Sequence, residues 1–385
     1  MTVSVSVGVS DEPDSVEAFG SAARAAAAGL EGDCDLALVF CGAPHLERAE
    51  EVLRVVHERL SPGALIGCGA GGVLGAGREI EAGPGASVWA LSAPEATIAT
   101  HHLEAGPAAQ GAAVSGLPDP ERMGEAMIVL AEPFTFSAEA LLARLNLERP
   151  GMPVLGGLAS AAAARSGMLF RDAEVLDSGA VACSLAGLGV MPCVSQGARP
   201  VGPEMTITEA RGNLITELAS RPAIERLREA IGELDEREQR LAGDGLMLGF
   251  VIDENQPSYE RGDFLVRPII GADPAAGSLA VSAAVRIGQT VRIHVRDGAT
   301  ADEDLRDALR VQSQALGAAG AAGALLFTCN GRGSHMFEVP DHDAKALDDA
   351  LGVPAAGFFC AGEIGPVGGA NFLHGFTATI AVFPP

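Results

Sequence analysis

Short apolar runs alternate with amphipathic stretches along the chain, and three of these runs begin the same succession of elements. The runs are DLALVFCG at 35–42, MIVLAE at 127–132 and GALLFTCN at 323–330. Continuous apolar runs of this length, bounded by turn residues, are typical of buried strands. Each is followed by a stretch with helical spacing, a proline, a glycine-rich strand and loop, and a β-hairpin pattern.

The recurring order predicts duplicated units. We expect the segments beginning at Asp35, Met127 and Gly323 to superpose as strand–helix–strand–hairpin units. Their glycine-rich loops should then occupy equivalent places, at 67–72, 156–160 and 357–365. The alternative is the strand–helix order that any α/β protein shows by chance, but the matching proline and glycine positions favour duplication. A β-rich block at 246–296 lacks the helix after its first strand, and we interpret it as a degenerate fourth copy.

The number of strand patterns decides the fold class. They outnumber simple strand–helix–strand crossovers, so the sequence predicts an α/β fold of mixed α+β character. Mixed β-sheets should have helices packed on their outer faces. A charged amphipathic stretch at 220–245 separates an N-terminal module, residues 1–219, from a C-terminal module, residues 220–385.

Charge and targeting signals restrict the partners. The 385 residues include 50 acidic and 26 basic ones, for a net charge of −24, and no basic run occurs. Nucleic acids and anionic membranes are therefore unexpected partners. No apolar run reaches the length of a membrane helix, and the N-terminus alternates like a strand without the basic residues of a signal peptide. We expect a cytoplasmic protein.

Several cofactor chemistries lack their residues. Lys345 is the only lysine, so a phosphate-binding loop with Gly-Lys-Ser/Thr is excluded, and pyridoxal phosphate would need this helix residue as its Schiff base. The seven cysteines include no Cys-x-x-Cys pair, and no zinc, calcium or hydrolase motif occurs. We therefore predict no cofactor and no metal, and we assign no catalytic residue.

Two C-terminal runs, FTCNGRG at 327–333 and GFFCAGEIGPVGGANFLHGFT at 357–377, carry a family resemblance. DLALVFCGAPH, IGCGAGG and PVLGGLAS match more loosely. The chain resembles the FIST family, with a FIST N-like first module and a FIST C-like second module. The resemblance implies a sensory domain of signal transduction that binds a small molecule, an amino acid or a related metabolite. Since two modules fill the 385 residues, any output domain should belong to a separate signalling protein.

The candidate ligand site lies where two strands of the third unit end. The helix at 341–351 returns the chain between these strands, so they can run parallel with both loops at one edge of the sheet. Arg332 and Glu363 could then clasp the two ends of a zwitterion. The predicted ligand-binding residues are Cys329, Asn330, Gly331, Arg332, Gly333, Gly362, Glu363 and Asn371.

Structural interpretations remain open for the same residues. Arg332 can pair with an acidic neighbour, and Glu363 can pair with Arg332 to pin two loops together. Cys329 is a buried inert thiol or a reactive one, and we expect it to be alkylated faster than Cys34 or Cys183, which lie in apolar runs. The leading function is a small-ligand sensor. The alternatives are an enzyme with Cys329 as nucleophile and a non-catalytic interaction scaffold.

Overall fold

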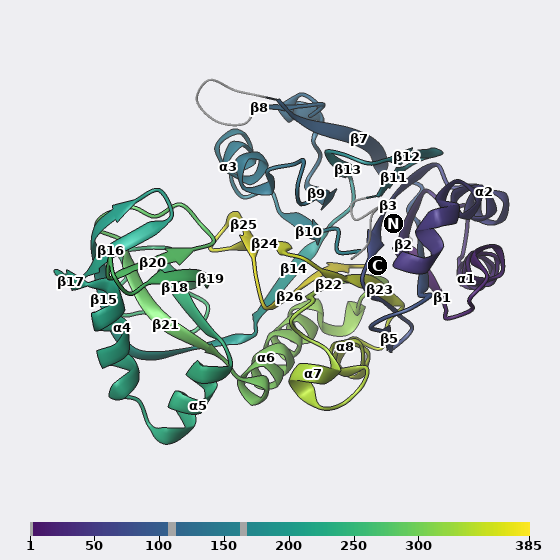
Figure 1. Ribbon diagram of the computed structural model, residues 1–385. Helices are drawn as coiled ribbons and strands as arrows, with labels where there is room; N and C mark the ends of the chain where they lie inside the picture. The colour runs from purple at the N-terminus through teal and green to yellow at the C-terminus, as the bar shows by residue number, and fades with distance from the viewer. Residues whose placement is uncertain (1–2, 107–112, 162–167) are drawn as a thin grey trace. The chain divides into compact units, whose positions relative to one another are not determined.

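The computed structural model describes residues 3–106, 113–161 and 168–385. The chain divides into two compact units (Figure 1). Unit 1 comprises Met1–Val194 and Leu305–Pro385, and unit 2 comprises Ser195–Asp304. Each unit has its own sheets and hydrophobic core.

Unit 1 contains three β-sheets. In order across the sheet, the first has β1 (Ser4–Ser10), β6 (Ala86–Ser92), β2 (Leu36–Gly42), β3 (Ala64–Ala70), β11 (Leu169–Arg171) and β12 (Glu174–Leu176). The second has β8 (Ala113–Ser115), β7 (Thr97–Gly106), β13 (Ala180–Ala186), β9 (Ala126–Ala131), β10 (Val154–Leu158), β24 (Glu363–Val367) and β25 (Ala370–His374). The third has β14 (Met191–Gln196), β26 (Thr377–Phe383), β22 (Gly323–Cys329), β23 (Ala355–Cys360), β4 (Val73–Gly75) and β5 (Arg78–Ile80).

These sheets share one internal order. The two central strands, β2–β3, β9–β10 and β22–β23, are parallel in each case because a helical connection returns the chain between them. A returning strand pairs antiparallel with the first of them: β6 with β2, β13 with β9 and β26 with β22. A hairpin completes the other edge. Mixed sheets are therefore confirmed, whereas superposition of the three predicted units stays a prediction.

The hairpins are exchanged among the three sheets of unit 1 in a cycle. The β4–β5 hairpin follows β3 in the chain but pairs with β23, and β11–β12 follows β10 but pairs with β3. The β24–β25 hairpin follows β23 but pairs with β10. Each sheet is thus completed by a hairpin that follows a strand of another sheet in the chain.

Alternate strand residues from all three sheets meet in one core. Phe40, Phe327 and Phe358 lie there with ring centroids 5.1–6.5 Å apart, and Trp89 lies 5.1 Å from Phe383. Edge and offset ring contacts of this kind add to the apolar area that large rings bury. Five of the 16 Phe, Trp and Tyr residues thus lie where the sheets meet.

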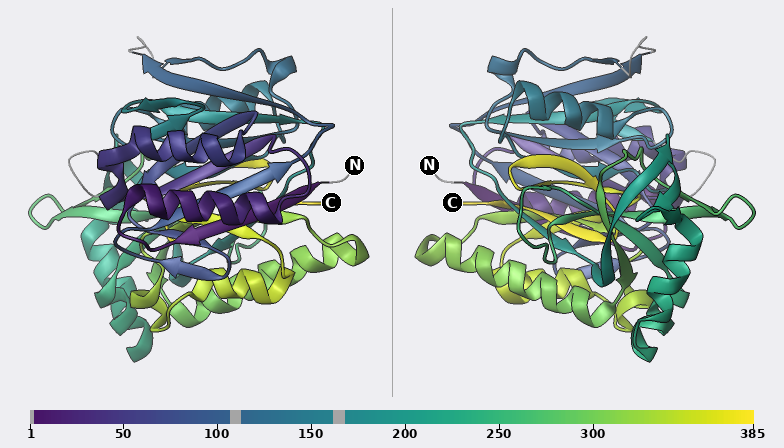
Figure 2. Two further views of the ribbon diagram at one scale, coloured as in Figure 1. Left: turned by 90° about the vertical axis from the view of Figure 1, so that its right-hand side faces the viewer. Right: turned by 90° about the vertical axis from the view of Figure 1, so that its left-hand side faces the viewer.

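Helices cover the opposite, outer faces of the sheets, as predicted. Helices α1 (Ser15–Gly29) and α2 (Ala49–Leu60) lie side by side over the first sheet (Figure 2). Helix α3 (Ala138–Glu148) packs on the second sheet, and its N-cap is Ser137, which accepts a hydrogen bond from the Ala140 amide. Helices α6 (Gly298–Leu316) and α8 (His342–Leu351) contribute Leu309 and Leu347 to the outer core of the third sheet.

Unit 2 is a separate antiparallel structure. Its sheet has, in order, β15 (Ala198–Arg211), β21 (Thr290–Arg296), β18 (Leu246–Val251), β19 (Phe264–Asp273), β20 (Ser278–Val281), β16 (Leu214–Leu218) and β17 (Arg221–Pro222). β15 also pairs with β16, so the sheet closes on itself. The helices of this unit are α4 (Ala223–Gly232) and α5 (Glu236–Asp244). Among its described strands every pairing is antiparallel, so the interpretation of 246–296 as a fourth copy is wrong.

The compact units do not follow the predicted module boundary at 219/220. The chain leaves the third sheet after β14, builds unit 2, and re-enters unit 1 within α6. Unit 2 therefore takes residues from both predicted modules. The division into residues 1–219 and 220–385 remains a prediction about sequence modules.

Candidate functional site

The loops after β22 and β23 lie at the same edge of the third sheet. Cys329 is in register with Cys360 across the parallel pair, as the predicted crossover requires. Beyond these positions, the CNGRG loop continues toward α7 (Ser334–Phe337), and Glu363 begins β24. The topology thus places Cys329 and Glu363 at neighbouring strand ends.

Arg332 is held inside the protein by Asp343. The Arg332 side chain is 1% exposed, and its Nε and Nη2 donate to Asp343 Oδ2 and Oδ1 at 2.6 and 2.8 Å. Thr328 Oγ1 donates to Asp343 Oδ2 at 2.5 Å, and His342 Nδ1 lies 2.8 Å from Oδ1. Burial raises the pKa of Asp343, but the Arg332 guanidinium outweighs this effect and holds the pKa well below its usual range.

One guanidinium nitrogen is left over. Arg332 Nη1 is buried and has no hydrogen-bond partner among the described residues. Its guanidinium carbon lies 5.0 Å from the Phe337 ring centroid, a cation–π contact. The open interpretation that Arg332 pairs with an acidic neighbour therefore describes two of its three nitrogens.

Glu363 is a fully buried carboxyl group with one satisfied oxygen. Oε2 accepts hydrogen bonds from Thr377, at 3.1 Å from its amide and 2.7 Å from its hydroxyl. The Cys329 thiol is within hydrogen-bonding reach of the carboxyl group and, with Thr377, lowers its pKa, while Oε1 has no partner with full hydrogen-bond geometry in the described part of the chain. Burial raises the pKa of Glu363 to about 8, and burial with the neighbouring Glu363 charge raises that of Cys329 to about 12.

The glycines and Asn330 shape the two loops. The Gly331 amide donates to Cys329 Sγ at 3.3 Å, and an added Cβ at Gly331 would lie 2.6 Å from the Phe376 ring. Gly333 has φ 97°, a left-handed conformation that favours glycine. The Gly362 carbonyl accepts from the Leu158 amide, and the exposed Asn330 donates its backbone amide to Cys360.

Asn371 belongs to a different network. Its Oδ1 accepts from the Val154 amide at 2.8 Å, and its Nδ2 donates to the Met152 carbonyl at 2.8 Å and to Asn146 Oδ1 at 3.1 Å. These bonds tie β25 to the start of β10 and to α3. The structure therefore brings Cys329, Arg332 and Glu363 together with the loop glycines, while the Asn371 side chain holds the hairpin in place.

Sequence reasoning missed Asp343 and the threonines that complete the cluster. The charged, amphipathic pattern of DHDAKALDDALG favours an exposed helix, yet Asp343 is 2% exposed. A signal was present: Asp343 precedes the buried Ala346 and Leu347 by three and four residues, which places it on the buried face of α8. Thr328 was inside the predicted strand and Thr377 two residues after Gly375, where nothing marked either as a partner.

The internal order of the sheets shows what is particular to this cluster. One hairpin residue in each sheet takes the corresponding register position. In the first sheet it is Leu169, which pairs with Cys68, itself in register with Phe40. In the second it is Glu363, across from Gly157 and Leu130, and in the third it is Val73, across from Phe358 and Phe327. Leu169 and Val73 are fully buried apolar residues. A carboxyl group at the equivalent place is costly to bury. Residues that break a local packing rule in this way concentrate at functional sites.

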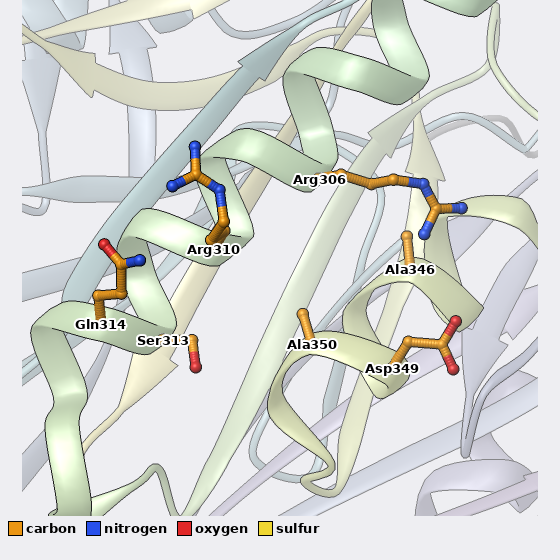
Figure 3. Close-up of a pocket in the computed structure, with 7 residues that line it drawn as sticks. All are labelled: Arg306, Arg310, Ser313, Gln314, Ala346, Asp349 and Ala350. Carbon is orange, nitrogen blue, oxygen red and sulfur yellow. The ribbon is translucent and has the colours of Figure 1, made fainter.

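A surface groove lies elsewhere in unit 1, between α6 and α8 (Figure 3). Its volume is about 320 Å³, and it is lined by Arg306, Arg310, Ser313, Gln314, Ala346, Asp349 and Ala350. None of the predicted site residues lines it. Within the described residues, no three His, Cys, Asp or Glu side chains are arranged to hold a metal ion, and no helix has the length and apolarity to cross a membrane.

Fold and site together define a mixed α/β protein with hairpin-exchanged sheets and a buried polar cluster at a strand-end edge. Comparison of the sequence with known families then places it: the FIST N domain matches residues 35–221 and the FIST C domain matches residues 223–366. The chain belongs to the FIST family, whose domains are sensory domains of signal transduction.

Relatives of the same length are found in mycobacteria. An uncharacterised protein of Mycobacterium tuberculosis strain H37Rv is 42% identical over 383 residues, which cover 98% of this chain and 99% of the relative. An uncharacterised protein of Mycobacterium bovis is also 42% identical over 383 residues, 98% of each chain. The similarity therefore extends over both FIST domains of this chain.

Proposed function

We propose that this protein is a cytoplasmic sensor that binds a small zwitterion, an amino acid or a related metabolite, at the cluster of Cys329, Arg332 and Glu363. The observation that carries the proposal is a pair of unsatisfied atoms. Arg332 Nη1 and Glu363 Oε1 are both buried without a partner of full hydrogen-bond geometry in the described structure, and Cys329 interacts with both side chains, through its thiol with Glu363 and through charge with Arg332.

A zwitterion supplies what both atoms lack. Leaving a buried polar atom unpaired costs about 1–3 kcal/mol, more for a charged group, so partners at both atoms would favour binding. The ligand carboxylate would accept from Arg332 Nη1, and its ammonium group would donate to Glu363 Oε1. Asn330, Gly331, Gly333 and Gly362 would form the surrounding backbone.

The protonation state of Glu363 sets the pH at which such a ligand binds. With a pKa of about 8, the carboxyl group is mostly neutral at pH 7 and must lose a proton to accept an ammonium group. Affinity should therefore rise as pH increases toward 8. Binding would also place a buried negative charge beside Cys329, and a separate signalling protein would respond to the resulting rearrangement of the loops.

The raised pKa of Cys329 supports binding over nucleophilic catalysis. A nucleophilic cysteine works as the thiolate, and a pKa of about 12 leaves very little thiolate at neutral pH. The enzyme alternative would need a ligand or partner that lowers this pKa. The scaffold alternative gives no reason for an ionisable residue at the apolar position of Glu363.

A thermal-shift screen against the amino acids and related metabolites tests the proposal. A ligand that binds the native state should raise the melting temperature of the native chain, and this shift should be lost in Glu363→Gln. Glu132→Gln is the matched control, because Glu132 is also a buried acidic residue, directly after β9. Its carboxylate accepts hydrogen bonds from the Phe134 and Thr135 amides of its own loop. A shift of equal size in all three proteins would overturn the assignment of the site.

A further inference from the structure

We propose that residues 333–341 form a lid over the cluster, latched by Glu81 and Asp341, and that its opening admits the ligand. The inference rests on the proposed function, since it concerns access to the same site. It assigns a role to three residues that the ligand-binding cluster does not use: Glu81, Ser334 and Asp341.

The lid is the layer between Arg332 and solvent. Phe337 lies over the Arg332 guanidinium and stacks on the His342 ring, with centroids 3.4 Å apart and planes 6° from parallel. Arg332 and Asp343 beneath are almost completely buried, whereas Ser334, His335, Glu338, Val339 and Pro340 are exposed. Phe337 of this segment therefore covers the guanidinium, and the residues on either side of it in the segment face solvent.

The lid has backbone features of a hinged segment at both ends. Gly333 has φ 97° at its start, and Glu338 and Asp341 have φ 58° and 60° near its end. Residues other than glycine rarely adopt these left-handed values, and surrounding contacts must maintain them. Opening the lid lets Glu338 and Asp341 relax to ordinary backbone conformations. The strain that is released offsets part of the free energy of the contacts that are lost.

The latch is polar and near the surface. Glu81 accepts hydrogen bonds from the Ser334 amide at 2.8 Å and from its hydroxyl at 2.7 Å. Asp341 Oδ1 accepts from the Glu79 amide at 2.7 Å, and its Oδ2 pairs with Lys345. Because water competes for exposed hydrogen bonds, the latch can open while the buried Arg332–Asp343 pair stays intact.

The latch residue Glu81 lies far in sequence from the residues of the binding cluster. Glu79 lies in β5 and Glu81 directly follows it; the β4–β5 hairpin follows β3 but completes the third sheet beside β23. Hairpin exchange thus brings Glu79 and Glu81, which follow β3 in the chain, to the binding cluster in the third sheet. Movement of this hairpin would change access to the cluster.

Cys329 Sγ accepts a hydrogen bond from Gly331 in the loop that leads into the lid, so alkylation of Cys329 by iodoacetamide measures opening of the lid without any ligand. In Glu81→Ala, which removes both latch bonds to Ser334, Cys329 should be labelled about 5-fold faster or more than in the native chain. Cys183 should keep its native rate, since it is fully buried between strands. Mass spectrometry of the native, unreduced protein gives both rates at once.

Matched variants make the result decisive. Glu58→Ala removes an exposed ion pair with Arg54, far from the lid in sequence, and should leave the Cys329 rate unchanged. Ser334→Ala removes only the hydroxyl bond and should accelerate labelling by a smaller factor. An unchanged Cys329 rate in Glu81→Ala, or equal acceleration of Cys183, would overturn the lid. Failure of the thermal-shift screen with accelerated Cys329 labelling would instead reject the proposed function alone.

Discussion

Single buried charges govern the energetics of the candidate site. Asp343 accepts four polar contacts, two from Arg332 and one each from Thr328 and His342. An ion pair taken out of water needs such complete hydrogen bonding, because desolvation cancels much of the attraction. Glu363 lacks this support and responds by a raised pKa instead.

Asp343→Asn should destabilise the protein by about 3–5 kcal/mol, since it leaves the Arg332 charge buried without its partner. Urea unfolding followed by circular dichroism would measure the change. Glu58→Gln breaks the exposed pair with Arg54 and should cost no more than about 1 kcal/mol. An Asp343→Asn variant as stable as the native chain would contradict the role of this pair.

The raised pKa of Glu363 predicts a specific pH dependence. Glu363 ionises near pH 4.5 when unfolded and near pH 8 when folded, so the folded chain binds more protons between these values. Its contribution to stability is therefore complete below about pH 4.5 and declines as pH rises to about 8.

Glu363→Gln, which cannot ionise, should be more stable relative to the native chain at pH 8.5 than at pH 5.5. Unfolding free energies of both proteins at the two pH values test this sign. Glu79, whose pKa burial raises to about 7, is present in both proteins and cancels in the comparison. A difference that is independent of pH would show that Glu363 is not held neutral.

At the scale of elements, hairpins are fixed by side chains as well as by strand pairing. The β24–β25 hairpin meets β10 through only two register pairs, Gly156 with Ile364 and Gly157 with Glu363. Asn371 adds bonds to the amide of Val154 and the carbonyl of Met152. This residue therefore anchors the hairpin whose first residue is Glu363.

Asn371→Ala should lower stability by about 1–3 kcal/mol, because it leaves buried backbone groups of Val154 and Met152 unpaired. Urea unfolding measures the loss. Asn255→Ala, at an exposed turn, serves as the control and should have little effect. If Asn371→Ala instead abolished a thermal shift by ligand while leaving stability unchanged, Asn371 would belong to the binding site.

At the scale of the whole molecule, the exchange of hairpins ties the two sequence modules together. β23 needs β4 from the first module as its outer neighbour, and β10 of the first module needs β24 from the second. Unit 2, in contrast, closes its own sheet and has its own core around Ile207, Leu248 and Ile293.

A fragment of residues 195–304 should therefore unfold cooperatively in urea, whereas a fragment of residues 220–385 should show no cooperative transition. The second fragment exposes the edge of β23 and lacks β15, which closes the sheet of unit 2. Circular dichroism during urea titration distinguishes the two. Cooperative unfolding of 220–385 would contradict the dependence on the exchanged hairpins.

The sequence by itself determined the local elements and the local crossovers. The apolar runs at 35–42, 127–132 and 323–330 became β2, β9 and β22 within one residue, because a buried strand needs apolar side chains on both faces. The crossover through 341–351 fixed Cys329 and Glu363 at one edge, because a short helical return makes its flanking strands parallel.

Tertiary structure alone decided which strands pair and which charged side chains form an ion pair. Backbone hydrogen bonds are the same for every sequence, so the pattern of Val73 and Leu74 shows that β4 is buried but not that its neighbour is β23. The same holds for Arg332: its loop was visible in the sequence, but its partner Asp343 depended on how α8 packs against the third sheet. Local periodicity specifies the face of an element that is buried, while the partner of that face is set by the packing of distant segments.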